Sequence, residues 1–152
     1  MQRLGEHRGP WVGTTRFRLL PTDAPHEGTA SATVSAGGHL TSLAYTWEHP
    51  IDGSQDGLLV LGATEDPDRV VALWGDSWHQ TTAQVLSGVV DGSVVTVRCA
   101  YAGDWEWIIT VDVTDTDTLR IRMDNVVPAS MAAEGHSTGP YWAMDTKLRR
   151  RE

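Results

Sequence analysis

Polar and apolar positions alternate with a period of two along most of this chain. The segment 41–47 places Leu43, Tyr45 and Trp47 on one face, with small or polar residues between them. Residues 105–113 repeat the pattern with apolar side chains at the odd positions. Such alternation is typical of half-buried β-strands. Because no segment has a sustained 3.6-residue period, we predict an all-β protein.

Turn-forming residues divide the chain into short segments. Asp91-Gly92 is the clearest two-residue hairpin signal, and Gly37-Gly38 supplies a second tight turn. Turns recur about every 8–12 residues, which is typical of a sandwich or a barrel. We predict about ten strands in a single antiparallel up-and-down barrel, because closure removes both sheet edges. The expected strands cover residues 11–20, 28–35, 39–48, 58–64, 69–76, 79–87, 94–101, 105–113, 119–125 and 141–150.

The 152 residues are expected to form one domain, residues 1–152, which is long enough to bury a core. Residues 1–9 are a polar lead-in, expected to form a short helix or plug over one barrel end. The longest irregular stretch, residues 128–140, is expected to form a one-turn helix or a mobile flap. Residues 58–64 are apolar at both parities, so the pattern leaves their inward face undecided.

Tryptophan is the compositional anomaly, with seven Trp against one Phe and three Tyr. This enrichment indicates core packing or an aromatic-lined pocket, and in a closed barrel the two overlap. Asn125 is a polar residue on an apolar parity, so its amide needs a partner, either a backbone group or a ligand. Parity gives these candidate ligand-binding residues: Tyr45, Trp47, Trp74, Trp107, Asn125 and Trp142.

The net charge of −8 argues against nucleic acid as a partner, because an acidic surface repels phosphate. No apolar run approaches the length that spans a membrane, and the first residues lack the apolar region of a signal peptide. We therefore expect a cytoplasmic monomer or homodimer that binds a small molecule and neither nucleic acid nor a membrane. The single cysteine, Cys99, excludes an internal disulfide.

The six histidines have no metal-binding spacing, so we predict no metal site. His26, His39 and His49 lie in Gly- and Pro-rich turns and are expected to be exposed. The segment Asp76-Ser77-Trp78-His79 gathers an acid, a hydroxyl and an imidazole, but no Gly-x-Ser-x-Gly elbow occurs. We interpret it as a hairpin turn with local hydrogen bonds and assign no catalytic residue.

Gly9-Pro10-Trp11 resembles the Gly-x-Trp signature of lipocalins and other calycins. Together with Gly38-His39-Leu40, Gly57 and Asp91-Gly92, it makes the chain similar to a bacterial lipocalin-like family of unknown function with single ten-stranded domains. The resemblance implies that a basic residue of the last strand packs over Trp11 as a barrel-end plug. Arg149 and Arg150 are the candidates, and parity favours Arg150.

Within the same superfamily, fatty-acid-binding proteins carry a helix pair between their first two strands. The short connection from Leu20 to Gly28 has no room for that pair, which argues against a fatty-acid carrier. Nitrobindin, a haem-binding calycin, is nearer in shape, and a haem of that kind would need one axial histidine. His136, in the irregular stretch before the last strand, is the candidate, although we expect no cofactor.

Three functions follow as hypotheses. The leading one is a calycin-like barrel that binds a small hydrophobic or aromatic molecule in its interior. The second is a barrel of the same fold that acts as an enzyme or haem-binding protein through His79 or His136. The third is a packed barrel that acts only in protein interaction. The state of the interior distinguishes them, since side chains that fill it leave no binding site.

Overall fold

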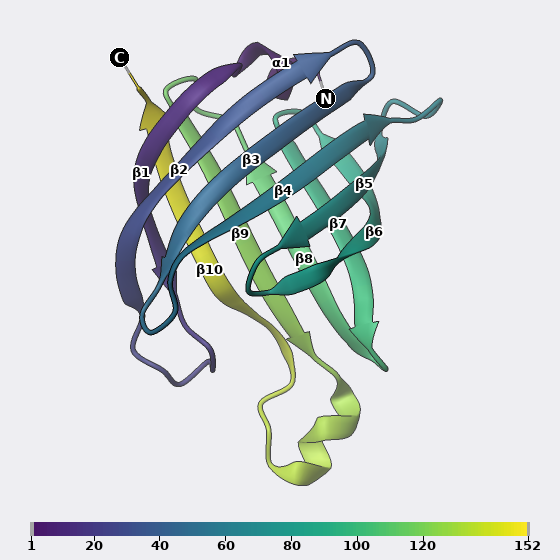
Figure 1. The fold of residues 1–152 in the computed structure, drawn as a ribbon. Helices are drawn as coiled ribbons and strands as arrows, with labels where there is room; N and C mark the ends of the chain where they lie inside the picture. Colours follow the sequence, from purple (N-terminus) through teal and green to yellow (C-terminus); the bar gives the residue numbers. More distant parts are fainter. Residues whose placement is uncertain (1, 152) are drawn as a thin grey trace.

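The computed structural model describes residues 2–151 and arranges them as a closed antiparallel β-barrel (Figure 1). This confirms the predicted all-β barrel. Helix α1 (Gln2–Glu6) precedes the barrel, and a 3-10 helix, η1 (Ala129–Glu134), lies between the last two strands. The ten strands of the described range are β1 (Gly9–Phe17), β2 (His26–Gly37), β3 (Leu40–His49), β4 (Gly53–Ala63), β5 (Arg69–Asp76), β6 (Gln80–Asp91), β7 (Val94–Ala102), β8 (Trp105–Asp112), β9 (Thr118–Val127) and β10 (Gly139–Arg150).

Each strand pairs with its neighbour in sequence, and β1 pairs with β10 to close the barrel. The closing register runs from Trp11 opposite Arg150 to Phe17 opposite Met144. In an up-and-down barrel the odd-numbered strands all end where the even-numbered strands begin. Residues from the ends of β1, β3, β5, β7 and β9 therefore meet at one end of the barrel, and that end holds a cavity.

Trp11 closes the other end of the barrel, beneath α1. Its side chain is completely buried, and its indole N–H donates to the carbonyl oxygen of His7 at 2.9 Å. Of the two candidate arginines, Arg150 lies over the indole, with its guanidinium carbon 4.7 Å from the ring centroid. Arg150 also donates to the carbonyl oxygen of Arg8 at 2.8 Å. Leu4 of α1 is buried as well, so the lead-in segment covers this end of the barrel.

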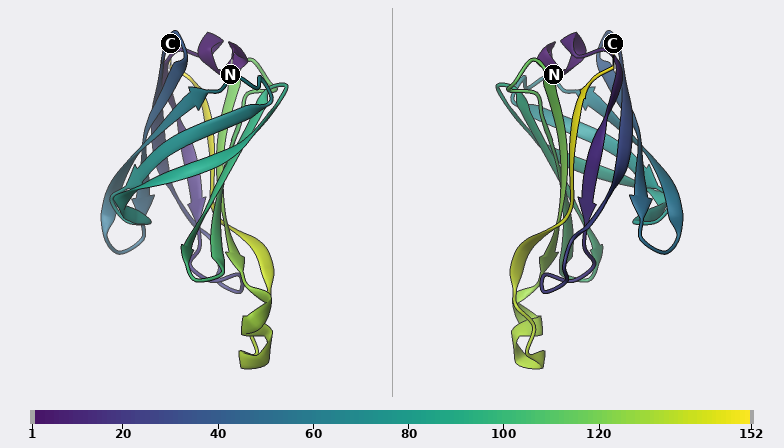
Figure 2. Two further views of the ribbon diagram at one scale, coloured as in Figure 1. Left: turned by 90° about the vertical axis from the view of Figure 1, so that its right-hand side faces the viewer. Right: turned by 90° about the vertical axis from the view of Figure 1, so that its left-hand side faces the viewer.

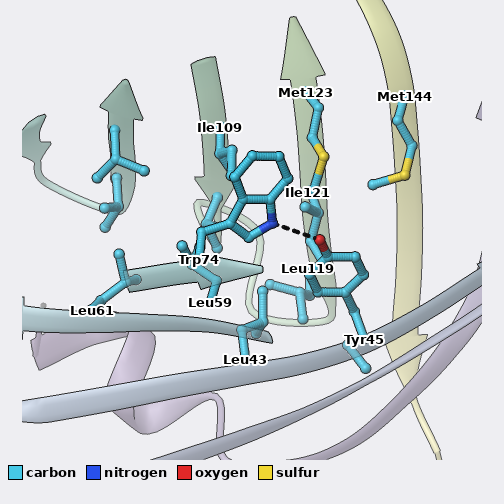
Figure 3. Close-up of a cluster of buried hydrophobic side chains, with 14 of the residues drawn as sticks. Leu43, Tyr45, Leu59, Leu61, Trp74, Ile109, Leu119, Ile121, Met123 and Met144 are labelled. Carbon is cyan, nitrogen blue, oxygen red and sulfur yellow. Dashed lines mark hydrogen bonds between the residues drawn. The ribbon is translucent and has the colours of Figure 1, made fainter. Parts of the chain in front are cut away.

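Aliphatic side chains fill the middle of the barrel (Figure 3). Leu43 of β3, Ile121 of β9 and their neighbours are buried, as the alternation in those strands predicts. The undecided segment 58–64 is also resolved, because Leu59 and Leu61 of β4 point inward and are buried. Leu58, of the other parity, lies on the outer face and is 47% exposed. The apolar residues of this segment therefore belong to the core at one parity and to the surface at the other.

The inward position expected of Trp142 is wrong. The register between β9 and β10 shifts between Trp142 and Met144, which pair with Asp124 and Met123 respectively. Ala143 is the extra residue of this β-bulge, and an added residue inverts the parity of everything on one side of it. Trp142 therefore lies on the outer face, where the guanidinium carbon of Arg18 is 4.0 Å from its ring centroid.

The segment around η1 projects beyond the barrel at the end away from α1 (Figure 2). Gly135 ends η1 in the left-handed conformation, at φ 82°, where glycine is favoured. A short helix is thus confirmed in the stretch 128–140. Neither helix of the described residues has the length and apolar character needed to cross a membrane.

Candidate functional site

A cavity of about 190 Å³ lies at the end of the barrel opposite Trp11. Its walls come from the ends of odd-numbered strands, the starts of even-numbered strands and the turn between β5 and β6. Aromatic side chains dominate the lining, which also includes the polar residues Arg18, His79, Gln80 and Asn125. The lining residues are Phe17, Arg18, Leu19, Trp74, Trp78, His79, Gln80, Tyr101, Trp107, Asn125, Tyr141 and Ala143.

His79 lies at the centre of the aromatic cluster that bounds this cavity. Its ring stacks on Trp47, with 4.8 Å between centroids and 18° between planes. Trp107 is 5.0 Å away on another side, and the edge of Trp78 is also 5.0 Å away. Phe17 completes the enclosure at 5.9 Å. Four aromatic rings thus surround one imidazole.

Asp76, at the end of β5, fastens this cluster to the barrel wall. Its side chain is 4% exposed, and Oδ1 accepts the backbone N–H groups of Trp78 and His79 at 2.9 and 2.8 Å. Oδ2 accepts the Tyr45 hydroxyl at 2.8 Å and the Trp47 indole N–H at 3.1 Å. These two oxygens receive four hydrogen bonds, which suits an ionised carboxylate that only accepts. The bonds to Trp78 and His79 confirm the predicted local hydrogen bonding of Asp76.

The hydrogen-bonded chain continues from Asp76 to the cavity wall. The Trp74 indole N–H donates to the Tyr45 hydroxyl at 2.8 Å, as Figure 3 shows. Burial and the neighbouring Asp76 charge raise the pKa of Tyr45 well above its ordinary value, so the hydroxyl keeps its proton. Gly57 lies opposite Tyr45 on β4, and a Cβ there would collide with the phenol ring. The glycine therefore leaves the space that Tyr45 occupies.

The imidazole of His79 is neutral at physiological pH. Burial lowers its pKa to about 4, because the surrounding rings give a cation no solvation. The Asp76 charge opposes this shift, and His49 adds to it. A buried, neutral imidazole is a polar group in an apolar wall.

We expect acidification to weaken the fold through His79. The folded-state pKa of about 4 lies below the ordinary value of 6.5, so the unfolded chain binds the proton more readily as the pH falls. The contribution of neutral His79 to the free energy of unfolding is therefore fully present above pH 6.5 and is lost as the pH falls toward 4. Between pH 7 and pH 4 the free energy of unfolding should fall by about 3 kcal/mol more in the wild type than in His79→Phe. Urea denaturation of both proteins at the two pH values measures the difference, and equal losses would refute it.

A hydrogen-bonded chain of polar side chains borders the cavity. The Tyr101 hydroxyl donates to Asn125 Oδ1 at 2.8 Å, and Asn125 Nδ2 donates to the Tyr141 hydroxyl at 3.1 Å. Tyr141 in turn donates to the carbonyl oxygen of Leu19 at 2.7 Å. The amide of Asn125 is therefore bound by two tyrosine hydroxyls, from β7 and β10, and not by the backbone group or ligand that its parity suggested.

The structure places the six candidate ligand-binding residues in three different environments. Trp74, Trp107 and Asn125 line the cavity. Tyr45 and Trp47 are buried behind this lining and bind Asp76, while Trp142 faces outward. The candidate set left out nine of the twelve lining residues, among them Trp78, Tyr101 and Tyr141, which lie near strand ends or in a turn. His79 also lines the cavity, although the sequence named it only for an enzyme or haem-binding alternative. The up-and-down topology itself was the signal that these ends meet.

The structure places two histidines differently from what the sequence predicted or allowed. His49 is buried, contrary to its expected exposure, because its ring stacks on Trp78 at 4.6 Å between centroids. Its Nδ1 accepts the backbone N–H of Asp52 at 3.0 Å, so the imidazole gives this N–H of the turn between β3 and β4 a hydrogen-bond partner. His136 follows η1 on an exposed segment and does not line the cavity, so it is not placed to hold a haem there.

The segment from Asp76 to His79 does not have the geometry of a catalytic triad. The Ser77 hydroxyl donates to Gln55 Oε1 at 2.7 Å on the exposed side of the turn. Asp76 contacts the backbone of His79, whereas a triad acid orients the imidazole ring. No group of three His, Cys, Asp or Glu side chains in the described part of the chain is arranged to hold a metal ion.

No protein-family model matches the chain, and no curated protein matches it significantly in sequence. The fold and the cavity are therefore the observations from which a function can be argued.

Proposed function

We propose that this protein binds one small aromatic molecule in the cavity at the barrel end opposite Trp11. The observation that carries the proposal is an aromatic-walled space in a barrel whose middle is otherwise filled. An apolar cavity of about 150 Å³ accommodates a benzene-sized ring, and this one holds about 190 Å³. The proposed ligand is therefore about one ring with a few substituent atoms.

The wall chemistry supports the same class of ligand. Trp74 and Trp107 stack with 8° between their planes and 6.0 Å between their centroids, which presents extended ring surface to the cavity. Aromatic rings contribute large apolar area and offset-stacked or edge contacts to a bound ring. The Asp76 network holds the cluster rigid, so little ordering cost accompanies binding. The lipocalin-like resemblance of Gly9-Pro10-Trp11 agrees with a binding role.

Toluene tests this proposal directly. At a free concentration of 100 times Kd, a ligand that binds only the folded state adds about 2.7 kcal/mol to stability, so the melting temperature should rise with toluene concentration. Tryptophan fluorescence should change over the same range, because Trp74, Trp78 and Trp107 line the cavity.

A cavity-filling variant supplies the control. Ala143 is buried and lines the cavity, so Ala143→Leu should occupy the space and remove the toluene response. Ala83→Leu adds the same atoms at an exposed position of β6 and should leave the response unchanged. If toluene, ethylbenzene and indole all leave the wild type unaffected in both measurements, the proposal fails.

A further inference from the structure

The outer face of four neighbouring strands forms an apolar surface. Strands β3, β4, β5 and β6 follow one another around the barrel (Figure 1), and their registers align outward residues in rows across the strands. The large apolar residues of three successive rows define what we call the apolar face: Leu40, Leu58, Val60, Val71, Leu73 and Val85. Only Ser, Ala and Gly occupy the other paired positions of these rows.

The side chains of the apolar face are open to solvent. Leu73 at the centre is 49% exposed, and Val85, which pairs with it, is 71% exposed. Of the eleven large apolar residues that are exposed in the described range, five belong to the apolar face. Exposed apolar residues scattered singly are normal in soluble proteins, whereas a contiguous group of them marks an interaction site.

The rest of the barrel wall has a different chemistry. Four of the five ion pairs among the described residues join side chains of β1 and β7–β10. The fifth, between His49 and Asp52, lies at the turn after β3. The three rows of the apolar face hold no charged residue. One side of the wall is therefore built for water, and the other is built for a partner.

The apolar face has the size of the core of a protein interface. Three rows on four strands cover about 400 Å², at about 4.8 Å between strands and about 3.4 Å per residue. Val89 extends this area at one end, and Thr46 extends it at the other. Each partner of a stable complex contributes about 800 Å², typically as an apolar centre inside a polar rim. The apolar face supplies about half of that area as its centre.

Two features of the apolar face favour a second copy of this chain as its partner. The closed barrel has no free strand edge, so a partner must pack against the side chains of the wall. The net charge of −8 makes two copies repel each other, and the uncharged rows are a surface through which they can meet.

The charges at the two ends of the apolar face are opposite in sign. Asp56 points outward from β4 two residues before Leu58, beyond the third row, and Arg69 points outward from β5 two residues before Val71, beyond the first row. Neither residue belongs to an ion pair within residues 2–151. A two-fold axis in the plane of contact, through the middle of the face, brings Arg69 of each copy opposite Asp56 of the other. The face is then complementary to itself, as a two-fold interface requires.

We propose that the apolar face is the contact surface of a homodimer, in which two copies of this chain pack face to face about a two-fold axis. Two sheets in this arrangement lie about 10 Å apart and interlock their outward side chains. The apolar face and the cavity lining share no residue, so the dimer leaves both cavities in place.

Sedimentation equilibrium of the full chain tests the proposal. The average mass should rise with concentration from 16.6 kDa toward twice that value. Val85→Asp should weaken dimerisation by at least about 30-fold, because it buries a carboxylate without a partner in the contact. Val12→Asp makes the same change at an exposed position of β1 and should leave the dimer unchanged. Both valines are exposed, so both variants should fold, which circular dichroism checks.

Exchange of the two end charges tests the two-fold arrangement. In Arg69→Glu a carboxylate faces Asp56 of the other copy, so dimerisation should weaken by about three- to tenfold. Asp56→Arg should have a similar effect, because two guanidinium groups then face each other. The variant that carries both changes restores an opposite pair at each end and should recover the wild-type affinity.

A monomer at every concentration overturns the proposal. A dimer that Val85→Asp leaves intact, or that Val12→Asp disrupts as strongly, also overturns it, since either result places the contact on another surface. If the charge exchange does not recover the affinity, the two-fold arrangement is wrong. A toluene response in a protein that stays monomeric leaves the proposed function standing while the dimer is refuted.

Discussion

Asp76→Asn is expected to destabilise the protein by at least about 3 kcal/mol, because a buried acceptor of four hydrogen bonds becomes partly a donor. An asparagine amide presents its NH₂ either to Tyr45 and Trp47 or to the backbone N–H groups of Trp78 and His79. One pair of donors then faces another donor inside the barrel. The turn between β5 and β6 would lose its attachment to the wall, and the cavity would lose its fixed shape.

Urea denaturation followed by circular dichroism measures this loss. Asp56→Asn is the matched control, since Asp56 lies on the neighbouring strand β4 with an exposed side chain. Surface substitutions of this kind change stability by about 0.5 kcal/mol or less. A loss below about 1 kcal/mol for Asp76→Asn would mean that the network does not hold the cluster in place. Asp76→Ala should be at least as damaging, because it leaves all four donors unpaired.

Trp11→Ala is expected to cost about 3–5 kcal/mol, as truncation of a fully buried aromatic side chain does. The indole is completely buried beneath α1, and its removal leaves a cavity that Leu4 and His7 cannot fill without moving. It also leaves the carbonyl oxygen of His7 without its 2.9 Å hydrogen bond. The barrel end opposite the aromatic cavity would open.

The same denaturation experiment checks this prediction, with Arg150→Ala as the comparison. The Arg150 side chain contributes a cation–π contact from the exposed side, so its removal should cost only about 0.5–1 kcal/mol. Equal losses for the two variants would argue that Trp11 acts only through the arginine. A loss below about 1 kcal/mol for Trp11→Ala would show that the tryptophan does not close the barrel end.

Ligand binding and barrel closure are separable in these experiments, because they concern opposite ends of the molecule. Trp11→Ala should remove stability at the α1 end, whereas Ala143→Leu should fill the cavity at the other end. Asp76→Asn is expected to have both kinds of effect. The variant should lower the stability of the fold and also weaken the binding of any ligand in the cavity, because hydrogen bonds to the Asp76 carboxylate position the backbone of His79 and Trp78.

The sequence alone determined the class of fold and the direction of most side chains. Alternation has a period of two because successive residues of a strand point to opposite faces, so burial at Tyr45 and Trp47 followed from local pattern. The position of Trp11 at the start of β1 and of Arg150 at the end of β10 was also readable, because closure pairs the first strand with the last.

Only the tertiary structure decided the site. A single extra residue, Ala143, reversed the parity of Trp142, and nothing in the local pattern marks a bulge before the register with β9 is known. The four partners of Asp76 come from β3 and from its own turn, so their convergence depends on the curvature that brings those strands around the barrel. The cavity exists because aromatic side chains from several strand ends enclose space without filling it, and packing of that kind is a property of the assembled barrel.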